Sequence, residues 1–126
     1  MVREYQYTIP KSEVLDQCRS ILTNLDYEID IYAPESNMLM TKPIKLRRAL
    51  RRFDYAIYVK ITDRIEIHIV AERSIFKRSS ESSVGGKGLF EKQSEEAMPI
   101  SLQRKIFIPI HNGMGKYNFR VQQIIQ

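Results

Sequence analysis

The residues of this chain that are best suited to chemistry form a basic segment in its first half. Six cations lie within eleven residues that contain no acid: Lys42, Lys45, Arg47, Arg48, Arg51 and Arg52. A cluster of this kind can contact phosphates or lipid headgroups, because each phosphate that it neutralises releases counterions. The spacing of Leu46, Leu50 and Phe53 predicts a helical turn that hides these apolar side chains and turns the arginines outward. The alternative interpretation is a solvated connection between two strands.

Sequence motifs for catalysis, cofactors and metals are missing from the chain. Gly85–Gly88 and Gly113–Lys116 faintly resemble phosphate loops, but neither has the Gly-x-x-x-x-Gly-Lys spacing followed by Ser or Thr. The two histidines, His68 and His111, have no cysteine or carboxylate at metal-ligand spacing. A nucleophile with a positioned base is not evident either. We therefore expect no enzyme, no catalytic residue, no cofactor and no metal.

The composition fits one domain of 126 residues, of which 43% are hydrophobic and 28% charged. The net charge of +5 favours an anionic partner, such as nucleic acid, membrane headgroups or an acidic protein face. The alternative is that this charge only supports solubility. Cys18 is the only cysteine, which excludes an internal disulfide. Apolar runs long enough to span a membrane are absent.

The elements that must position these residues begin with a long hairpin over Phe53–Lys77. Apolar residues alternate strictly on each side of a turn expected at Asp63–Arg64, and they are Ile57, Val59, Ile61, Ile65, Ile67, Ile69 and Ala71. Alternation of this length predicts two strands, each with one buried and one solvated face. Because the turn lacks the usual glycine, a slightly longer loop is also compatible.

The N-terminal half predicts a strand, a helix and a second hairpin. Arg3–Ile9 alternates, and Pro10 ends the strand. Apolar residues then recur at helical spacing over Val14–Leu25, with Ser12 as the expected cap and Cys18 inside the apolar stripe. Tyr27–Lys42 switches to strand periodicity around a central turn.

The C-terminal part predicts a loop, an edge strand and a helix. Ser79–Met98 is rich in Ser, Gly and Glu, which indicates a mobile loop with a short helix near Leu89–Ala97. Ile100–Ile110 is apolar but contains Pro109, which favours a short edge strand. Met114–Ile125 has helical spacing, with Asn112 as its cap. The predicted fold is α+β: an antiparallel sheet of five or six strands with N- and C-terminal helices packed on one face, as a single domain over residues 1–126.

This layout resembles known small α+β domains. A strand ending in Tyr7–Val14 leads into a helix ending in Leu22–Ile29, and a hairpin ending in Leu39–Lys42 follows. The order is similar to that of small domains of bacterial cell-envelope lipoproteins, including accessory lipoproteins of the outer-membrane protein assembly machinery. Asp26 stands where such domains often have glycine. The same segment is also similar to helix-grip lipid-binding domains, whose sheet wraps around a long C-terminal helix, whereas the terminal helix predicted here is short.

Three functions follow as expectations. The resemblance implies a non-catalytic cell-envelope domain with a protein-interaction or assembly role at a membrane surface. The alternatives are a nucleic-acid-binding module that uses residues 42–52, or a helix-grip carrier of an apolar ligand. Expected partners are therefore other proteins or an anionic membrane surface, with nucleic acid as an option. The start of the chain predicts a cytoplasmic protein, or a bacterial periplasmic or envelope protein if a native leader was replaced by Met1.

Overall fold

The structure is a computed structural model that describes residues 2–48, 51–77, 89–93 and 98–121, with side chains over 2–46, 54–71 and 98–121. These residues form eight strands, two α-helices and one 3-10 turn. In chain order they are β1 (Val2–Gln6), α1 (Lys11–Asn24), β2 (Ile29–Ala33), η1 (Pro34–Ser36), β3 (Met38–Thr41), β4 (Ile44–Arg48), β5 (Arg51–Ile61), β6 (Ile65–Lys77), β7 (Leu89–Gln93), α2 (Ile100–Lys116) and β8 (Arg120–Val121).

One antiparallel sheet organises the molecule. Six strands follow the order β2-β3-β5-β6-β1-β8, while β4 pairs with β5 and β7 pairs with β6. The predicted α+β class with an antiparallel sheet is confirmed, although the described strands exceed the five or six expected. The additional strands are β4, β7 and the short β8, which come from segments that were expected to be connections, a loop and a helix.

The hairpin of β5 and β6 is the backbone of this sheet. The two strands pair without interruption from Arg51↔Ile75 to Ile61↔Ile65, and a three-residue loop, Thr62–Arg64, joins them. Their alternating residues from Ile57 to Ala71 are all at most 4% exposed on the inward face. Alternation therefore predicted both the strands and the buried face correctly, and the loop is the longer variant.

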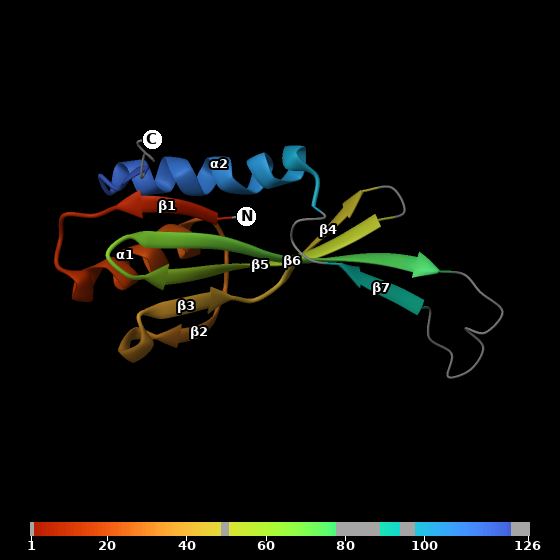
Figure 1. Ribbon diagram of the computed structural model, residues 1–126, viewed down its shortest axis with the longest axis horizontal. Coiled ribbons are helices and arrows are strands. Elements are labelled where there is room, and N and C mark those ends of the chain that lie inside the picture. The colour runs from red at the N-terminus through yellow and green to blue at the C-terminus, as the bar shows by residue number, and fades with distance from the viewer. Residues whose placement is uncertain (1, 49–50, 78–88, 94–97, 122–126) are drawn as a thin grey trace.

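The two long strands extend beyond the rest of the sheet. On the side away from β6, β5 pairs with β4 over Arg51–Tyr55 and with β3 over Tyr58–Lys60. On the side away from β5, β6 pairs with β1 over Ile65–His68 and with β7 over Arg73–Lys77. Figure 1 shows the consequence: β4, β7 and the adjoining halves of β5 and β6 project past the two helices. We call this projection the arm, and the part that carries the helices the body.

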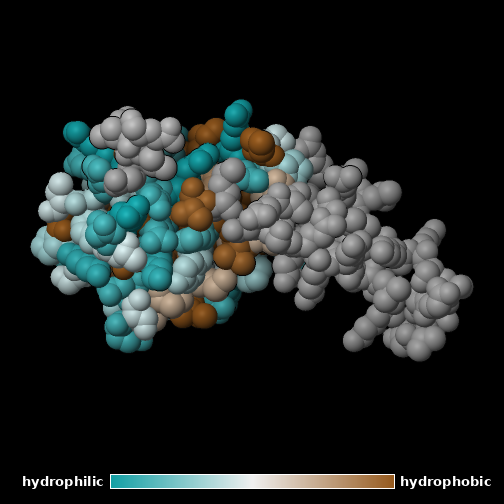
Figure 2. Space-filling model, viewed as in Figure 1, coloured by the Kyte–Doolittle hydropathy of each residue, from teal (hydrophilic) through white to brown (hydrophobic). Residues whose placement is uncertain are grey.

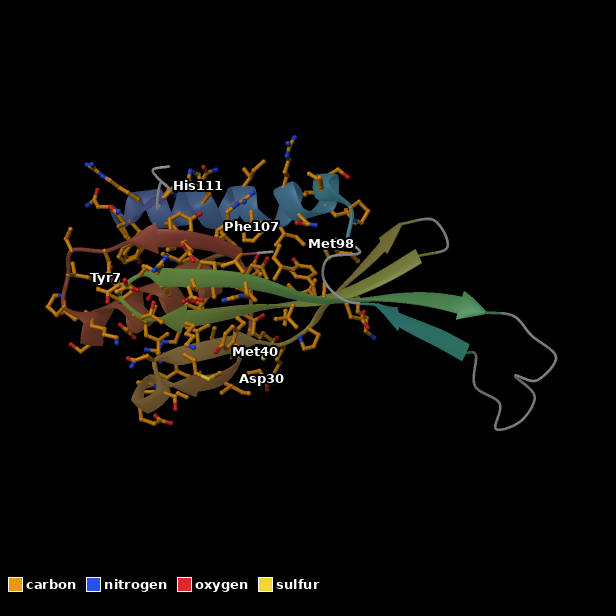
Figure 3. The ribbon with its side chains drawn as sticks, in the orientation of Figure 1. Tyr7, Asp30, Met40, Met98, Phe107 and His111 are labelled. Atoms are coloured by element: carbon orange, nitrogen blue, oxygen red, sulfur yellow. The ribbon has the colours of Figure 1, made fainter. Side chains whose placement is uncertain are left out.

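Both helices cover one face of the body. Helix α1 buries Val14, Leu15, Cys18, Ile21 and Leu22, as its apolar stripe predicted. Helix α2 buries Leu102, Ile106, Phe107, Ile110 and Met114. Figure 3 shows Phe107 and His111 on α2, which runs beside β1. The helices meet at Gly113, where an added Cβ would lie 2.7 Å from Cγ2 of Ile21, so only glycine allows this close approach.

Three predictions about the helices are wrong. Ser12 does not cap α1, because Pro10 is the N-cap residue and the helix begins at Lys11. Ile100–Ile110 is helix rather than edge strand, and Asn112 lies inside that helix instead of capping another. The apolar residues of 100–116 follow a helical period that buries them against the sheet, and Pro109 is tolerated on the exposed side at the loss of one backbone hydrogen bond.

Two predictions about connections are also wrong. Residues 89–93 form β7, which pairs with β6 in the register Phe76↔Phe90, so no helix covers them. The rest of the expected loop, 79–88 and 94–97, lies outside the described residues. The basic segment is not a helical turn, because Leu46 and Phe53 face each other across β4 and β5 and belong to two alternating strands.

The other face of the sheet carries no helix among the described residues. A continuous cross-strand row runs Ile31, Met40, Tyr58, His68 and Val2 from β2 to β1. Figure 2 shows hydrophobic residues interrupting the hydrophilic surface over these strands. Tyr58 packs against His68 across β5 and β6, with ring centroids 5.4 Å apart.

Candidate ligand-binding pocket

A pocket of about 840 Å³ opens where the arm leaves the body. It lies between the end of α1, the first half of α2, β4 and β5. Its apolar lining comes from Leu25, Ile44, Leu46, Leu102, Ile106 and Pro109. Its polar lining comes from Asn24, Asp26, Tyr27, Tyr55, Ser101 and Lys105. Pockets that hold small molecules have volumes of roughly 300–1,000 Å³, mostly apolar walls and a few convergent polar groups.

The end of α1 builds one wall of the pocket. The Asp26 N–H donates to the Thr23 carbonyl and the Tyr27 N–H to the Leu22 carbonyl, both at 3.1 Å. These two bonds form a Schellman motif, which requires a left-handed residue between the helix and the returning chain. Asp26 takes that conformation with φ 69°. The reversal directs Tyr27 back across the sheet and toward Tyr55.

Tyr27 and Tyr55 form a buried hydroxyl pair in the pocket. Their oxygens are 3.1 Å apart, their rings meet edge to face at 78°, and their exposed fractions are 8% and 6%. The pair has two hydroxyl protons, and one of them bridges the two oxygens. Within the described residues neither hydroxyl has another hydrogen-bond partner. The second proton is therefore available to an acceptor that enters the pocket.

Burial determines the protonation state of this pair. Desolvation raises the pKa of Tyr27 far above its ordinary value, and its hydrogen bond with Tyr55 raises the pKa further. Desolvation also raises the pKa of Tyr55, although its hydrogen bond with Tyr27 acts in the opposite direction. Both side chains stay neutral near pH 7. They can donate hydrogen bonds, but they are poorly suited to accept a proton from a substrate.

Helix α2 builds the opposite wall. Ser101, Lys105 and Pro109 are four residues apart and line the pocket from one side of the helix, next to Leu102 and Ile106. Pro109 has no N–H, so the carbonyl of Lys105 loses its usual helical donor. The exposed ammonium group of Lys105 is a cation at the pocket rim. An apolar ligand with a polar end could therefore bury its body between the walls and keep that end at the rim.

The structure separates the six residues of the basic segment. Lys42 lies at the end of β3, where its ammonium group is 3.3 Å from the Glu28 carboxylate. Lys45 lies in β4, opposite Asp54. The four arginines lie on the arm, in the register pairs Arg47↔Arg52 and Arg48↔Arg51, and their side chains are outside the described part. In the backbone register the four arginines lie near the β4–β5 connection, and Lys42 and Lys45 lie nearer the body.

The histidines occupy ordinary positions on the sheet and helix surfaces. The Nε2 atom of His68 is 3.1 Å from Glu66 Oε1, and the Nδ1 atom of His111 is 3.0 Å from the hydroxyl of Tyr5. Over the described residues, groups of three or more His, Cys, Asp or Glu side chains with metal-site geometry are not found. Cys18 is buried, and desolvation raises its pKa to about 12, as its place in the apolar stripe of α1 predicted.

Sequence reasoning missed the pocket because its walls come from distant segments. The strand assigned to 100–110 removed Leu102, Lys105 and Ile106 from consideration, although their helical spacing was visible in the sequence. The direction of the chain after α1 depends on the left-handed conformation of Asp26. The sequence around Asp26 does not predict that conformation.

Comparison with models of known protein families and with curated protein sequences finds no match to this chain. Neither helix in the described part of the chain is long and apolar enough to cross a membrane.

Proposed function

We propose that this chain is a non-catalytic binding domain that holds a small, mainly apolar ligand in the pocket beneath α2. The observation that carries the proposal is the pocket of about 840 Å³ with six apolar lining residues and a buried tyrosine pair. The helix-grip alternative drawn from the sequence requires a long C-terminal helix on the sheet. Helix α2 has 17 residues. The prediction of a short terminal helix, which argued against this alternative, is therefore wrong.

The walls favour a ligand with a defined chemical character. Burying about 200 Å² of apolar ligand surface at about 25 cal/mol per Å² contributes about 5 kcal/mol. A ligand that also carries an oxygen within its apolar body would gain about 1 kcal/mol from a hydrogen bond with the tyrosine pair. Part of this gain is offset by lost ligand freedom, so a dissociation constant of about 0.1–1 mM is expected. A fatty-acid-like or similar amphipathic molecule fits these requirements.

The pocket chemistry supports binding rather than catalysis. The tyrosine pair is neutral near pH 7 because burial raises the pKa of both hydroxyls. Lys105 is exposed at the rim and therefore well hydrated. General-base catalysis needs a group whose pKa lies near the working pH, and the shifts in this pocket point away from that value.

The proposal is tested by titrating the delipidated protein with a dansyl-labelled fatty acid and following the probe's fluorescence. We expect saturable binding with a dissociation constant of about 0.1–1 mM. Leu102→Trp fills the pocket and should weaken binding at least about tenfold, the loss expected when a larger side chain occupies the ligand's space. Val70→Trp is the matched control, because Val70 is 42% exposed on the opposite face of the sheet. Non-saturable binding, or equal loss in both variants, would overturn the proposal.

The broader expectation of a cell-envelope domain with a protein-interaction or assembly role at a membrane surface remains a prediction, as does its location. A ligand-binding pocket is compatible with it. Recovery of lipid from the native protein, detected by mass spectrometry under non-denaturing conditions, would connect the two. Absence of any bound apolar molecule in protein taken from its native source would count against a carrier role.

A second candidate function, polyanion binding, is favoured by one observation on the arm. The register places Arg47 opposite Arg52 and Arg48 opposite Arg51. Like charges directly opposite each other destabilise an antiparallel pair, and a bound polyanion would offset that repulsion. Nucleic acid is the polyanion that the sequence suggested.

Fluorescence anisotropy with a labelled single-stranded oligonucleotide tests this candidate at several salt concentrations. Affinity should fall steeply with salt and should be lost when all four arginines are replaced by alanine. The matched control removes four exposed cations of the body: Lys11, Lys60, Lys116 and Arg120. Equal effects of the two sets would show non-specific attraction to a basic protein and would exclude a site on the arm.

A further inference from the structure

The outer surface of α2 combines exposed isoleucines with cations. Ile100 and Ile108 are 61% and 58% exposed, the largest values among the large apolar side chains described. Arg104 lies midway between them in the sequence, so the three residues are spaced by four and share one side of the helix. Figure 2 shows the result as two hydrophobic patches along α2, separated by a hydrophilic projection. We call this row the α2 stripe.

The surroundings of the α2 stripe are positively charged. Helix α2 contains Arg104, Lys105 and Lys116 but no Asp or Glu. Arg3 of the adjacent β1 lies over the Phe107 ring, 4.9 Å from its centroid, and adds a fourth cation on the β1 side. The open face of the sheet is different, because there Glu4 pairs with Arg64 and Glu66 with His68. A negatively charged surface is therefore complementary to α2 and not to the open face.

We propose that the α2 stripe docks on an anionic phospholipid membrane. Exposed apolar side chains flanked by cations, on a helix that lies flat on the surface, are the features by which interfacial helices bind lipid headgroups and the acyl boundary. Two isoleucines and their neighbours offer too little area for a stable protein interface, which buries about 1,200 Å² or more. A membrane is the partner that uses a small apolar stripe together with diffuse positive charge.

The position of the stripe relative to the pocket gives this surface a role. Ile100, Arg104 and Ile108 each precede by one residue the pocket-lining row of Ser101, Lys105 and Pro109. The two rows are therefore adjacent on the helix, about 100° apart. A membrane seated on the stripe would face the rim where Lys105 stands. An amphipathic ligand could then pass between bilayer and pocket with its anionic end near Lys105, a consequence that rests on the proposed ligand-binding function.

The test is co-sedimentation of the full chain with vesicles, either of phosphatidylcholine alone or of equal parts phosphatidylcholine and phosphatidylglycerol, at low salt. Binding should require the anionic lipid and fall as salt rises. The double variant Ile100→Ser, Ile108→Ser should reduce the partition coefficient about tenfold or more, because both apolar insertions are lost. Ile31→Ser is the matched control, since Ile31 is 45% exposed on the open face.

Charge substitutions provide an independent arm of the experiment. Arg104→Glu should weaken vesicle binding several-fold more than Lys60→Glu, an exposed cation on the open face. Leu102→Trp, which fills the pocket, should leave vesicle binding unchanged while probe binding is lost. Failure of the pocket and failure of the membrane surface are therefore separately visible.

Three results would overturn the inference. Equal binding to both vesicle types would remove the role of the cations. An equal loss with Ile31→Ser would move the membrane surface to the sheet. Absence of vesicle binding, with sedimentation showing a dimer that the Ile100 and Ile108 changes dissociate, would assign the stripe to a protein partner.

Discussion

The hydroxyl pair of Tyr27 and Tyr55 predicts a specific pattern of stabilities. Tyr55→Phe leaves the hydroxyl of Tyr27, a residue that is 8% exposed in the parent, without another hydrogen-bond partner among the described residues. A buried hydroxyl without a partner costs about 1–3 kcal/mol, and the adjacent pocket can admit water, so about 1.5 kcal/mol is expected. Tyr27→Phe should cost a similar amount. The double variant removes both hydroxyls at once and should lie within about 0.5 kcal/mol of the parent.

The assay is urea unfolding of the ligand-free protein at pH 7, for the parent, both single variants and the double variant. The expected coupling energy is about 3 kcal/mol, and in a separate thermal melt each single variant should lower the melting temperature by about 5 °C. Additive losses would contradict the reasoning, because they would mean that each hydroxyl has its own partner. Single variants as stable as the parent would also contradict it, because water would then satisfy both groups.

The alkaline limb of stability is a second check on the same pair. Burial raises the pKa of both hydroxyls above the ordinary value of 10.0. A group whose folded-state pKa is raised stabilises the fold fully below its unfolded pKa, and that stability is lost as pH rises further. The parent should therefore lose stability above about pH 10. The double Phe variant should lose less over the same range.

Further predictions concern the helices. Gly113→Ala should destabilise the protein by about 1–3 kcal/mol through overpacking, whereas Gly115→Ala, whose Cβ would meet nothing within 4 Å, should stabilise it by about 0.5–1 kcal/mol. Asp26→Gly should stabilise it by about 0.5–1 kcal/mol, because φ 69° suits glycine better; urea unfolding measures all three. The Cys18 thiol, with its pKa raised to about 12, should react with a disulfide reagent at pH 8 only after denaturation.

The parts of the fold that the sequence predicted well are those with one uninterrupted period. The alternation around Asp63 and the apolar stripe of α1 allow only one arrangement in which the apolar residues are buried. Helix α2 was not predicted, because Pro109 is compatible both with an edge strand and with an exposed helix position. The local sequence does not distinguish these two positions. Packing against α1 makes that choice, through a contact at Gly113 that involves residues about ninety positions apart in the chain.

The candidate site was less predictable than the fold. The basic segment is recognisable in the sequence because its charges are consecutive, whereas the ion pair of Lys42 with Glu28 depends on the fold. The pocket is the reverse case. No sequence motif singles out Tyr27, Tyr55 and Lys105. They line one pocket only because the chain reverses after α1 and α2 packs beside it.

The place of β1 in the sheet has a consequence for how the chain is made. The first strand pairs on one side with β6, from Val2↔His68 to Tyr5↔Ile65, and on the other with β8 at Tyr5↔Val121. During synthesis the N-terminal strand therefore emerges with neither neighbour present and must wait for β6. The local β5–β6 hairpin can form early, but the body closes only through contacts of high sequence separation, which are slow to form. Until then the edge of β1 is unpaired, and partly folded states with unpaired strand edges are prone to association.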